Sequence, residues 1–207
     1  MFADRSDAAQ RLARALEHYK GSNPLVLGIP RGAVPMARDI ARALGGEVDV
    51  VLVRKLRAPG QREFAIGAID ESGRSYLNPE ASYLHIPEEY LQAERQEQLA
   101  TIRERRRTYT ANRPPIDPAG RIVIVVDDGL ATGSTMIAAL HALRAKNPGK
   151  LVCAVPVAPP DTLERVRPLC DELICLEPHR DFWAVSQFYA SFPQVDDDEV
   201  VAALSGK

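Results

Sequence analysis

The sequence predicts an α/β fold, in which a doubly wound, mostly parallel sheet carries an insertion in mid-chain. Short apolar runs alternate with amphipathic segments in both halves of the chain, and such alternation favours parallel pairing of strands. The alternation stops between residues 64 and 120 and then resumes. A chain of 207 residues suits one domain, because domains typically hold about 100 to 200 residues. We therefore predict a single domain over 1–207, with an insertion at 64–120 and an aromatic tail at 177–207.

The first part of the chain predicts two helices and two strands. In order, these are a helix over 7–19, a strand over 25–29, a helix over 34–44 and a strand over 48–53. Asp7 is the expected N-cap of the first helix, and Gly21 follows its end. Pro35 suits the first turn of the second helix, which two glycines terminate. The two strands should therefore pair in parallel.

The insertion predicts two short strands, over 64–70 and 75–77, followed by one long helix over 87–108. The apolar residues of this helix are sparse, so we expect a solvated arm. Its water-facing arginines would be Arg103, Arg105, Arg106 and Arg107. After the insertion, strands are predicted over 122–126, 151–157 and 172–176, and helices over 134–145, 161–166 and 198–204.

Composition favours a protein of the cytoplasm. A net charge of −2 gives no support to general binding of nucleic acid or of a membrane surface. No apolar run approaches the ~20 residues of a membrane helix, and the first residues lack an apolar signal core. The three cysteines form no CxxC pair and are expected to be reduced, and the four histidines lack metal-site spacing. We expect small-molecule substrates, with neither nucleic acid nor membrane as partner.

The segment 122–135 carries the clearest functional signal; it reads IVIVVDDGLATGST. An apolar strand ends in Asp127 and Asp128, and a helix begins within the small-residue loop that follows. Backbone N–H groups at a helix N-terminus bind anions, and Gly133 lets a phosphate approach the backbone. Loop hydroxyls are supplied by Thr132, Ser134 and Thr135. Two acids beside a phosphate loop suit a ribose 5-phosphate, whereas an ordinary helix cap needs only one or two such residues.

This segment resembles the phosphoribosyl pyrophosphate (PRPP) signature of the type I phosphoribosyltransferases. The family also interrupts its sheet with a hood insertion, and the chain is most similar to stand-alone bacterial members whose acceptor is unassigned. Gly129 stands where the family usually has an aliphatic residue, and we expect it to loosen the turn. Neither GxGxxG nor GxxxxGK[ST] occurs, so dinucleotide and P-loop sites lose their main support.

The resemblance implies roles for the residues of this segment. The 5-phosphate would be held by Ala131, Thr132, Gly133, Ser134 and Thr135. Asp127 and Asp128 would act as the catalytic pair, accepting hydrogen bonds from the ribose hydroxyls. Their charge would stabilise the oxocarbenium-like transition state as pyrophosphate leaves. Mg²⁺ would bind PRPP oxygens and water, with no direct protein ligand, and neutralise the leaving group.

A pyrophosphate site is expected just past the first strand, where the family places a short loop that sometimes contains a non-proline cis peptide. Arg31 offers a fork of donors to phosphate oxygens, and Gly32 tolerates unusual backbone angles. Lys55, after the second strand, matches a basic residue that contacts pyrophosphate in some members, and a solvated strand end is the alternative interpretation. In the family, the first strand neighbours the strand of the PRPP motif, so both loops would meet at the switch point of the sheet.

The predicted function is transfer of a 5-phosphoribosyl group from PRPP to a nitrogenous acceptor, a nucleobase or related heterocycle. A non-catalytic regulator that senses PRPP or a nucleotide is the alternative on the same fold; it would be expected to carry a DNA-binding or basic RNA-binding element, and neither is evident. A phospho-acceptor receiver domain would need its acid pair after the first strand. A homodimer is compatible with the resemblance.

The acceptor is constrained by the residue before the Thr-Gly of the loop. In relatives that use 6-oxopurines this residue is an aspartate, which can manage a proton at the reacting nitrogen. Here it is Ala131, whose side chain neither donates nor accepts a proton, as in adenine-type members. We expect hypoxanthine and guanine to be poor acceptors unless Glu63 or another acid substitutes. Phe182 or Trp183 could stack on a base, although tail aromatics more often pack on the sheet.

Overall fold

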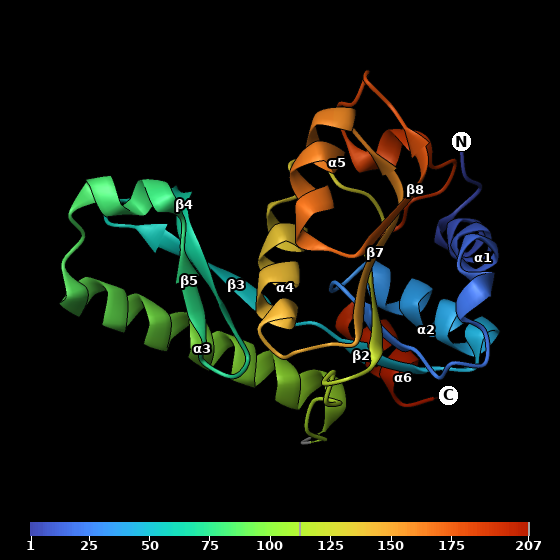
Figure 1. Ribbon diagram of the computed structural model, residues 1–207, viewed down its shortest axis with the longest axis horizontal. Coiled ribbons are helices and arrows are strands. Elements are labelled where there is room, and N and C mark those ends of the chain that lie inside the picture. Colours follow the sequence, from blue (N-terminus) through green and yellow to red (C-terminus); the bar gives the residue numbers. More distant parts are fainter. Residues whose placement is uncertain (112, 207) are drawn as a thin grey trace.

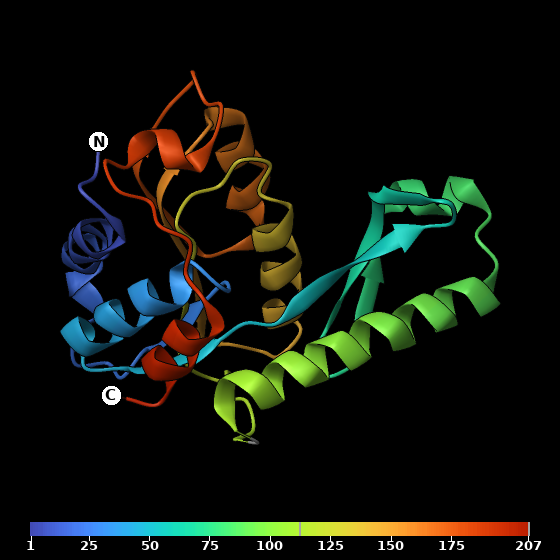
Figure 2. The same cartoon turned by 180° about the vertical axis from the view of Figure 1, so that it is seen from behind.

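The computed structural model describes residues 1–111 and 113–206, and these form a five-stranded parallel sheet and a three-stranded antiparallel sheet (Figure 1). Residue 112 of the predicted insertion, residue 207 of the predicted tail and the side chain of residue 62 lie outside the described part. The two sheets belong to different parts of the molecule: the parallel sheet forms the core, and the antiparallel sheet projects away from it (Figure 2).

The parallel sheet has the strand order β2-β1-β6-β7-β8. Its strands are β1 Leu25–Gly28, β2 Glu47–Val50, β6 Ile122–Val126, β7 Lys150–Ala158 and β8 Glu172–Pro178. The doubly wound, mostly parallel sheet predicted from the sequence is thereby confirmed. β1 pairs with β2 on one side and with β6 on the other, so the strand order reverses beside β1. At such a switch point the carboxyl ends of neighbouring strands frame the ligand crevice of open α/β sheets.

Helices cover both faces of this sheet (Figures 1 and 2). One face carries α1 Arg5–Ala15 and α2 Ala33–Leu44, and the other carries α4 Ser134–Arg144 and α5 Pro160–Val166. Strand side chains alternate between the faces: Val26, Ile124 and Val152 pack under α1 and α2, and their neighbours Leu25, Val123 and Leu151 pack under α4 and α5. Burying each of these side chains contributes about 1.5–3 kcal/mol, which makes the sheet a rigid base for the loops at its edge.

The first helix begins two residues before its predicted start. Its N-cap is Asp4, whose side chain accepts a hydrogen bond from the amide of Asp7 at 2.9 Å. Asp7, the predicted cap, lies inside the first turn and accepts from the amide of Ala3 at 3.0 Å. Both acids therefore accept hydrogen bonds from backbone amides at the start of the helix, an arrangement that resembles a capping box.

The three-stranded sheet and one long helix form a projection, here called the arm, over residues 53–110 (Figures 1 and 2). Its elements are β3 Val53–Ala58, β4 Gln61–Asp70, β5 Ser75–Leu77 and α3 Glu88–Thr110. The arm begins at Val53, and β3 and the start of β4 precede residue 64, near which the sequence predicts the insertion to begin. The predicted strand over 48–53 contains the end of one strand and the start of another, and three basic residues within β3 hid the second from an apolar pattern.

The helix α3 is not the fully solvated arm that its composition predicts. One face is buried against the arm sheet and against the C-terminal helix α6 Asp197–Leu204, which also packs on α2. The buried residues are Leu91, Glu94, Gln98, Ile102, Arg106 and Tyr109, three or four positions apart. Half of this stripe is polar, so an analysis based on apolar periodicity overlooks it.

The remaining structure is short. Single 3₁₀ turns occur at Glu17–Tyr19, Pro79–Leu84, Arg167–Leu169 and Val185–Phe188. A capping box formed by Asp196 and Glu199 starts α6. The three cysteines are free thiols. In the described part of the chain no helix combines the length and the apolar character needed to cross a bilayer.

Candidate functional site

The loops after β1 and β6 meet at the switch point of the sheet. The amide of Ile29 continues the ladder by donating to the carbonyl of Val126 at 3.0 Å. Beyond this bond, Gly32 of the first loop lies directly against the carboxylate of Asp128. The predicted neighbourhood of the two loops is therefore present, and it follows from the pairing of β1 with β6.

The acid pair at the end of β6 is half-buried and electrostatically unfavourable in the free protein. Asp127 Oδ1 accepts a hydrogen bond from the amide of Asp128 at 2.9 Å. Burial, and then the adjacent carboxylate of Asp128, raise the pKa of Asp127 well above its ordinary value. Burial also raises the pKa of Asp128. Groups that donate hydrogen bonds to both carboxylates would relieve this cost, and vicinal hydroxyls are such groups.

One cation partly compensates this acid pair, and sequence reasoning missed it. Arg5, the first residue of α1, donates from Nε to Asp128 Oδ2 at 2.9 Å. Its charge opposes the rise in the pKa of both acids. The two partners are 123 residues apart, and no local pattern links an arginine at a helix start to a distant strand end.

The predicted phosphate loop forms one compact turn between β6 and α4. Gly133 has φ +73°, and a Cβ there would come 2.7 Å from Cγ2 of Thr162, so glycine is required on both counts. Two residues of α5 brace the loop: Thr162 Oγ1 donates to the carbonyl of Ala131, and Arg165 Nη2 to that of Thr132, both at 2.7 Å. Neither brace was identified from the sequence.

The donors of this loop face solvent. Thr132 and Thr135 are exposed, and Ser134 is half-buried with its hydroxyl 2.7 Å from that of Thr132. The first amides of α4 have no intrahelical acceptor, as at any helix start, and therefore point toward the same space. All five residues predicted to bind the 5-phosphate thus lie together at a helix N-terminus, an arrangement that binds anions.

Gly32 has an ordinary backbone conformation, so the expectation that its unusual backbone angles explain the glycine is wrong. Its φ and ψ are −57° and −35°, so unusual angles are not needed. A side chain is excluded because its Cβ would overlap Asp128 Oδ2 and come 3.0 Å from Nη2 of Arg5. The peptide bond between Pro30 and Arg31 is cis, as in some members of the family that the sequence resembles.

Gly129 is likewise explained by crowding and not by a looser turn. A Cβ there would come 2.6 Å from Val185 Cγ1 and 2.9 Å from Val157 Cγ2. The chain at this point is also held by Tyr189, whose hydroxyl donates to the carbonyl of Asp128 at 2.6 Å. The turn after the acids is therefore tightly packed beneath the C-terminal tail.

Lys55 and Thr135 of the phosphate loop line one cavity of about 330 Å³ between the core and the arm. Pro30 and Thr135 line it from the core, and Arg54, Lys55 and Arg105 line it from the arm. Burial, and then the charges of Arg105 and Arg57, lower the pKa of Arg54. Positive charge therefore accumulates in this cavity, as an anionic ligand requires.

Arg31 points elsewhere. Its Nη1 is 3.6 Å from Asp197 Oδ1 of α6, and both side chains are about half exposed. Arg31 lines a neighbouring hollow of about 580 Å³ with Glu104 and Thr108 of α3, and the two hollows share Pro30 and Arg105. The structure thus brings Gly32 to the acid pair and Lys55 to the phosphate loop, but it does not bring the Arg31 side chain to either.

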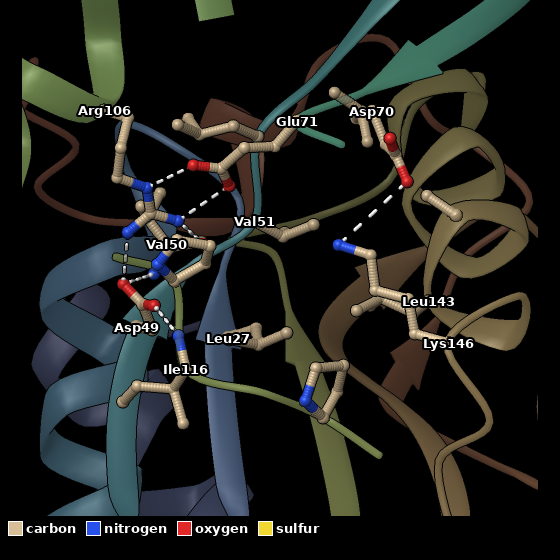
Figure 3. A pocket seen from close by; sticks show the side chains of 15 residues that line it. Leu27, Asp49, Val50, Val51, Asp70, Glu71, Arg106, Ile116, Leu143 and Lys146 are labelled. Carbon is tan, nitrogen blue, oxygen red and sulfur yellow. Dashed lines mark hydrogen bonds and ion pairs between the residues drawn. The ribbon is translucent and has the colours of Figure 1, made fainter. Parts of the chain in front are cut away.

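Arg106 contradicts the prediction of a water-facing arginine. Its side chain is 8% exposed and reaches Asp49 Oδ1 from Nη1 at 2.8 Å. Its Nε and Nη2 donate to the two oxygens of Glu71 at 2.5 and 2.9 Å (Figure 3). The adjoining cavity holds about 30 Å³, room for about one water molecule. This cluster joins α3 to β2 and to the turn after β4.

Comparison with known proteins identifies the family of this chain. The family model described as phosphoribosyl transferase domain matches residues 4–193. Two Mycobacterium tuberculosis proteins, from strains CDC 1551 and H37Rv, have names that assign them provisionally as phosphoribosyl transferases. Each is 42% identical over 205 residues, 99% of this chain and 46% of theirs. The chain therefore spans about half the length of these curated relatives.

Solved structures agree on the fold. The protein TT1426 from Thermus thermophilus is 44% identical, with a TM-score of 0.89 over 98% of this chain and 97% of that one. A purine phosphoribosyltransferase from Pyrococcus horikoshii, 15% identical, has a TM-score of 0.50 over 93% and 92% of the two chains, which shows a shared fold alone. Given a family match over most of its length and an acid pair followed by a phosphate-type loop, the chain belongs to the type I phosphoribosyltransferase family.

Proposed function

We propose that this protein transfers a 5-phosphoribosyl group from PRPP to a nitrogenous acceptor and releases pyrophosphate. One observation carries the proposal: two half-buried carboxylates with raised pKa values stand at the end of β6, directly ahead of an anion-binding loop. A ribose 5-phosphate presents hydroxyls and a phosphate in the same relation. The family and the fold support this activity in general terms.

The loop and the acid pair divide the work on the ribose. Residues 131–135 hold the 5-phosphate through amides and hydroxyls at the start of α4. Asp127 and Asp128 accept hydrogen bonds from the 2- and 3-hydroxyls. As pyrophosphate leaves, positive charge develops at the ribose carbon, and the nearby carboxylates stabilise it more than they stabilise the ground state.

The pyrophosphate end is assigned to Arg31, Gly32 and Lys55. Gly32 lets this loop pack against the acid pair, and Lys55 faces the positive cavity. The oxygen donors of the site, carboxylates and hydroxyls, are of the kind that suits a magnesium complex. Mg²⁺ would come to these residues bound to PRPP and water, with no side chain bonded to it, and would neutralise the charge of the leaving pyrophosphate.

The acceptor is proposed to be a nucleobase or related heterocycle other than a 6-oxopurine. Ala131 is exposed in the loop and carries no group that moves a proton. Loss of a positioned acid–base group typically costs about 10²–10⁴-fold in rate. In the aromatic tail, Phe182 packs on Phe188 with ring centroids 4.9 Å apart, which leaves Trp183, 90% exposed, as the ring free to stack.

The test is pyrophosphate release from PRPP and Mg²⁺ with adenine, hypoxanthine, guanine, orotate or uracil. We expect base-dependent release, with hypoxanthine and guanine at least about 100-fold slower than the best base. The double substitution Asp127→Asn, Asp128→Asn should abolish PRPP binding in calorimetry while the protein stays folded. Glu88→Gln with Glu89→Gln, an adjacent acid pair at the start of α3, is the matched control.

The outcomes separate the two candidate functions. PRPP binding without release for any base favours the non-catalytic regulator. Unchanged PRPP affinity in the Asp127, Asp128 double variant contradicts the ribose assignment. Efficient turnover of hypoxanthine or guanine contradicts the argument from Ala131.

A further inference from the structure

Arg5 reaches the acid pair from the opposite end of the chain. Its Nε lies 2.9 Å from Asp128 Oδ2, and the two side chains are only 13% and 16% exposed. The adjacent Asp127 lies beside the pair, and the hydroxyl of Tyr189 donates to the backbone carbonyl of Asp128. These are the titratable groups that the structure places against Asp128 among the described residues. Arg5 is the cation among them.

The guanidinium of Arg5 is fixed on several sides. Its Cζ lies 3.8 Å from the ring centroid of Phe192, a cation–π contact. Its Nη1 donates to the carbonyl of Pro193 at 2.5 Å. The backbone of Arg5 is fixed as well, because Asp4 caps the helix that begins there. Such an arginine has little freedom to leave Asp128, unlike a surface ion pair, which contributes little.

The ion pair of Arg5 and Asp128 also packs against Gly32 in the loop after β1. A Cβ at Gly32 would overlap Asp128 Oδ2 and come 3.0 and 3.1 Å from Nη2 and Nε of Arg5. The loop after β1 therefore rests on the ion pair, and the ion pair lies between the two loops that meet at the switch point. This location between the two loops is the one that a residue positioning Asp128 for a ligand would occupy.

We propose that Arg5 is a positioning residue that holds the Asp128 carboxylate, oriented and charged, for the ribose hydroxyls. The inference rests on the proposed function, because it assigns Asp128 to the ribose. Arg5 acts through Asp128 and does not touch the pyrophosphate. It therefore serves the ribose end of the ligand, in contrast to Arg31 and Lys55.

The experiment measures the affinity of three probes by calorimetry: PRPP, ribose 5-phosphate and inorganic pyrophosphate. Loss of a hydrogen bond to a charged group predicts that Arg5→Gln weakens PRPP and ribose 5-phosphate by about tenfold. Pyrophosphate should bind as before. Without the Arg5 charge the pKa of Asp128 rises further, so the acid limb of ribose 5-phosphate binding should move to higher pH.

Two further variants and a control complete the design. Arg5→Lys keeps the charge and should restore the pH limb but only part of the affinity, since an ammonium lacks the planar fork. Phe192→Leu removes the supporting ring and should cause a smaller loss with the same ligand pattern, even if Arg5→Gln fails to fold. Arg11→Gln is the matched control: Arg11 is also on α1, pairs with Asp7 and lies over Phe2.

Each remaining outcome decides between explanations. If Arg5→Gln and Arg11→Gln bind all three probes alike, and only thermal stability changes, Arg5 is structural and the inference is wrong. If pyrophosphate weakens as much as ribose 5-phosphate, Arg5 contacts the ligand directly and the positioning role is wrong. If the wild-type protein does not bind PRPP, the proposed function fails and takes this inference with it.

Discussion

Two clusters of buried charge differ in how completely their carboxylates are matched. Arg106 of the arm gives three hydrogen bonds, to Asp49 of β2 and to Glu71, and all three side chains are nearly enclosed. Burial works to lower the pKa of Arg106, but its two acids outweigh burial and the pKa is raised. At the end of β6, Arg5 bonds to Asp128 and acts on Asp127 only through its charge, and the pKa values of both acids are raised.

The difference separates a structural cluster from a site. Where arginine hydrogen bonds reach both buried carboxylates, as Arg106 reaches Asp49 and Glu71, the charges hold two parts of the chain together. Where burial exceeds compensation, a ligand that supplies hydrogen bonds completes the set, and perturbed pKa values of this kind concentrate at functional sites. The comparison can be tested from both sides, since the first cluster should control stability and the second should control binding.

The largest expected effect is on the arm cluster. Arg106→Met leaves Asp49 and Glu71 buried without their main partner, and removing one member of a buried ion pair costs about 3–5 kcal/mol. We expect the free energy of unfolding, measured in urea, to fall by that amount. Arg107→Met, at the exposed neighbouring position, is the control and should change it by less than about 0.5 kcal/mol. A loss below about 1 kcal/mol for Arg106→Met would mean that Arg113, 3.2 Å from Asp49, takes over its role.

The sequence predicts the core better than the arm, for a physical reason. Strands such as β6 are unbroken apolar runs, and the acids and glycine that follow mark their ends, so the parallel sheet and the phosphate loop are locally encoded. In β3 and α3 the packed faces carry charged residues, such as Arg57 and Glu94, whose ion-pair partners lie far along the chain. The role of Arg106 depends on Asp49, 57 residues earlier, and that of Arg5 on Asp128. Only the folded structure brings such partners together.

A smaller effect is expected at Arg31, on the ligand side of the comparison. Its contact with Asp197 is long and half-exposed, and such pairs contribute about 0–1 kcal/mol, so the side chain can turn to a ligand at low cost. Removing a charge-assisted contact costs about 1.5–3 kcal/mol. Arg31→Ala should therefore weaken PRPP about tenfold or more and leave ribose 5-phosphate nearly unchanged in calorimetry. Arg38→Ala on α2 is the control, and equal weakening of both ligands would place Arg31 away from the pyrophosphate.

The smallest expected effect is a gain in stability on removal of the Asp127 charge, which is opposite in sign to the loss expected for Arg106→Met. The pKa of Asp127 is raised in the folded protein, so the folded state binds its proton more tightly than the unfolded state does. The carboxyl therefore costs no stability below its ordinary pKa of 3.8, and the cost grows as pH rises through the folded value.

Asp127→Asn removes this charge and keeps an oxygen for the amide of Asp128. The melting temperature of the ligand-free variant should exceed that of the wild type at pH 7, and the gap should close as pH falls toward about 4. One kcal/mol corresponds to about 2–4 °C in a chain of this size, so a rise of that order is expected in scanning fluorimetry. Asp128→Asn should give no such rise, because it leaves the guanidinium of Arg5 without its carboxylate. A lower melting temperature for Asp127→Asn at pH 7, or a gap independent of pH, would show that the two buried clusters are matched alike.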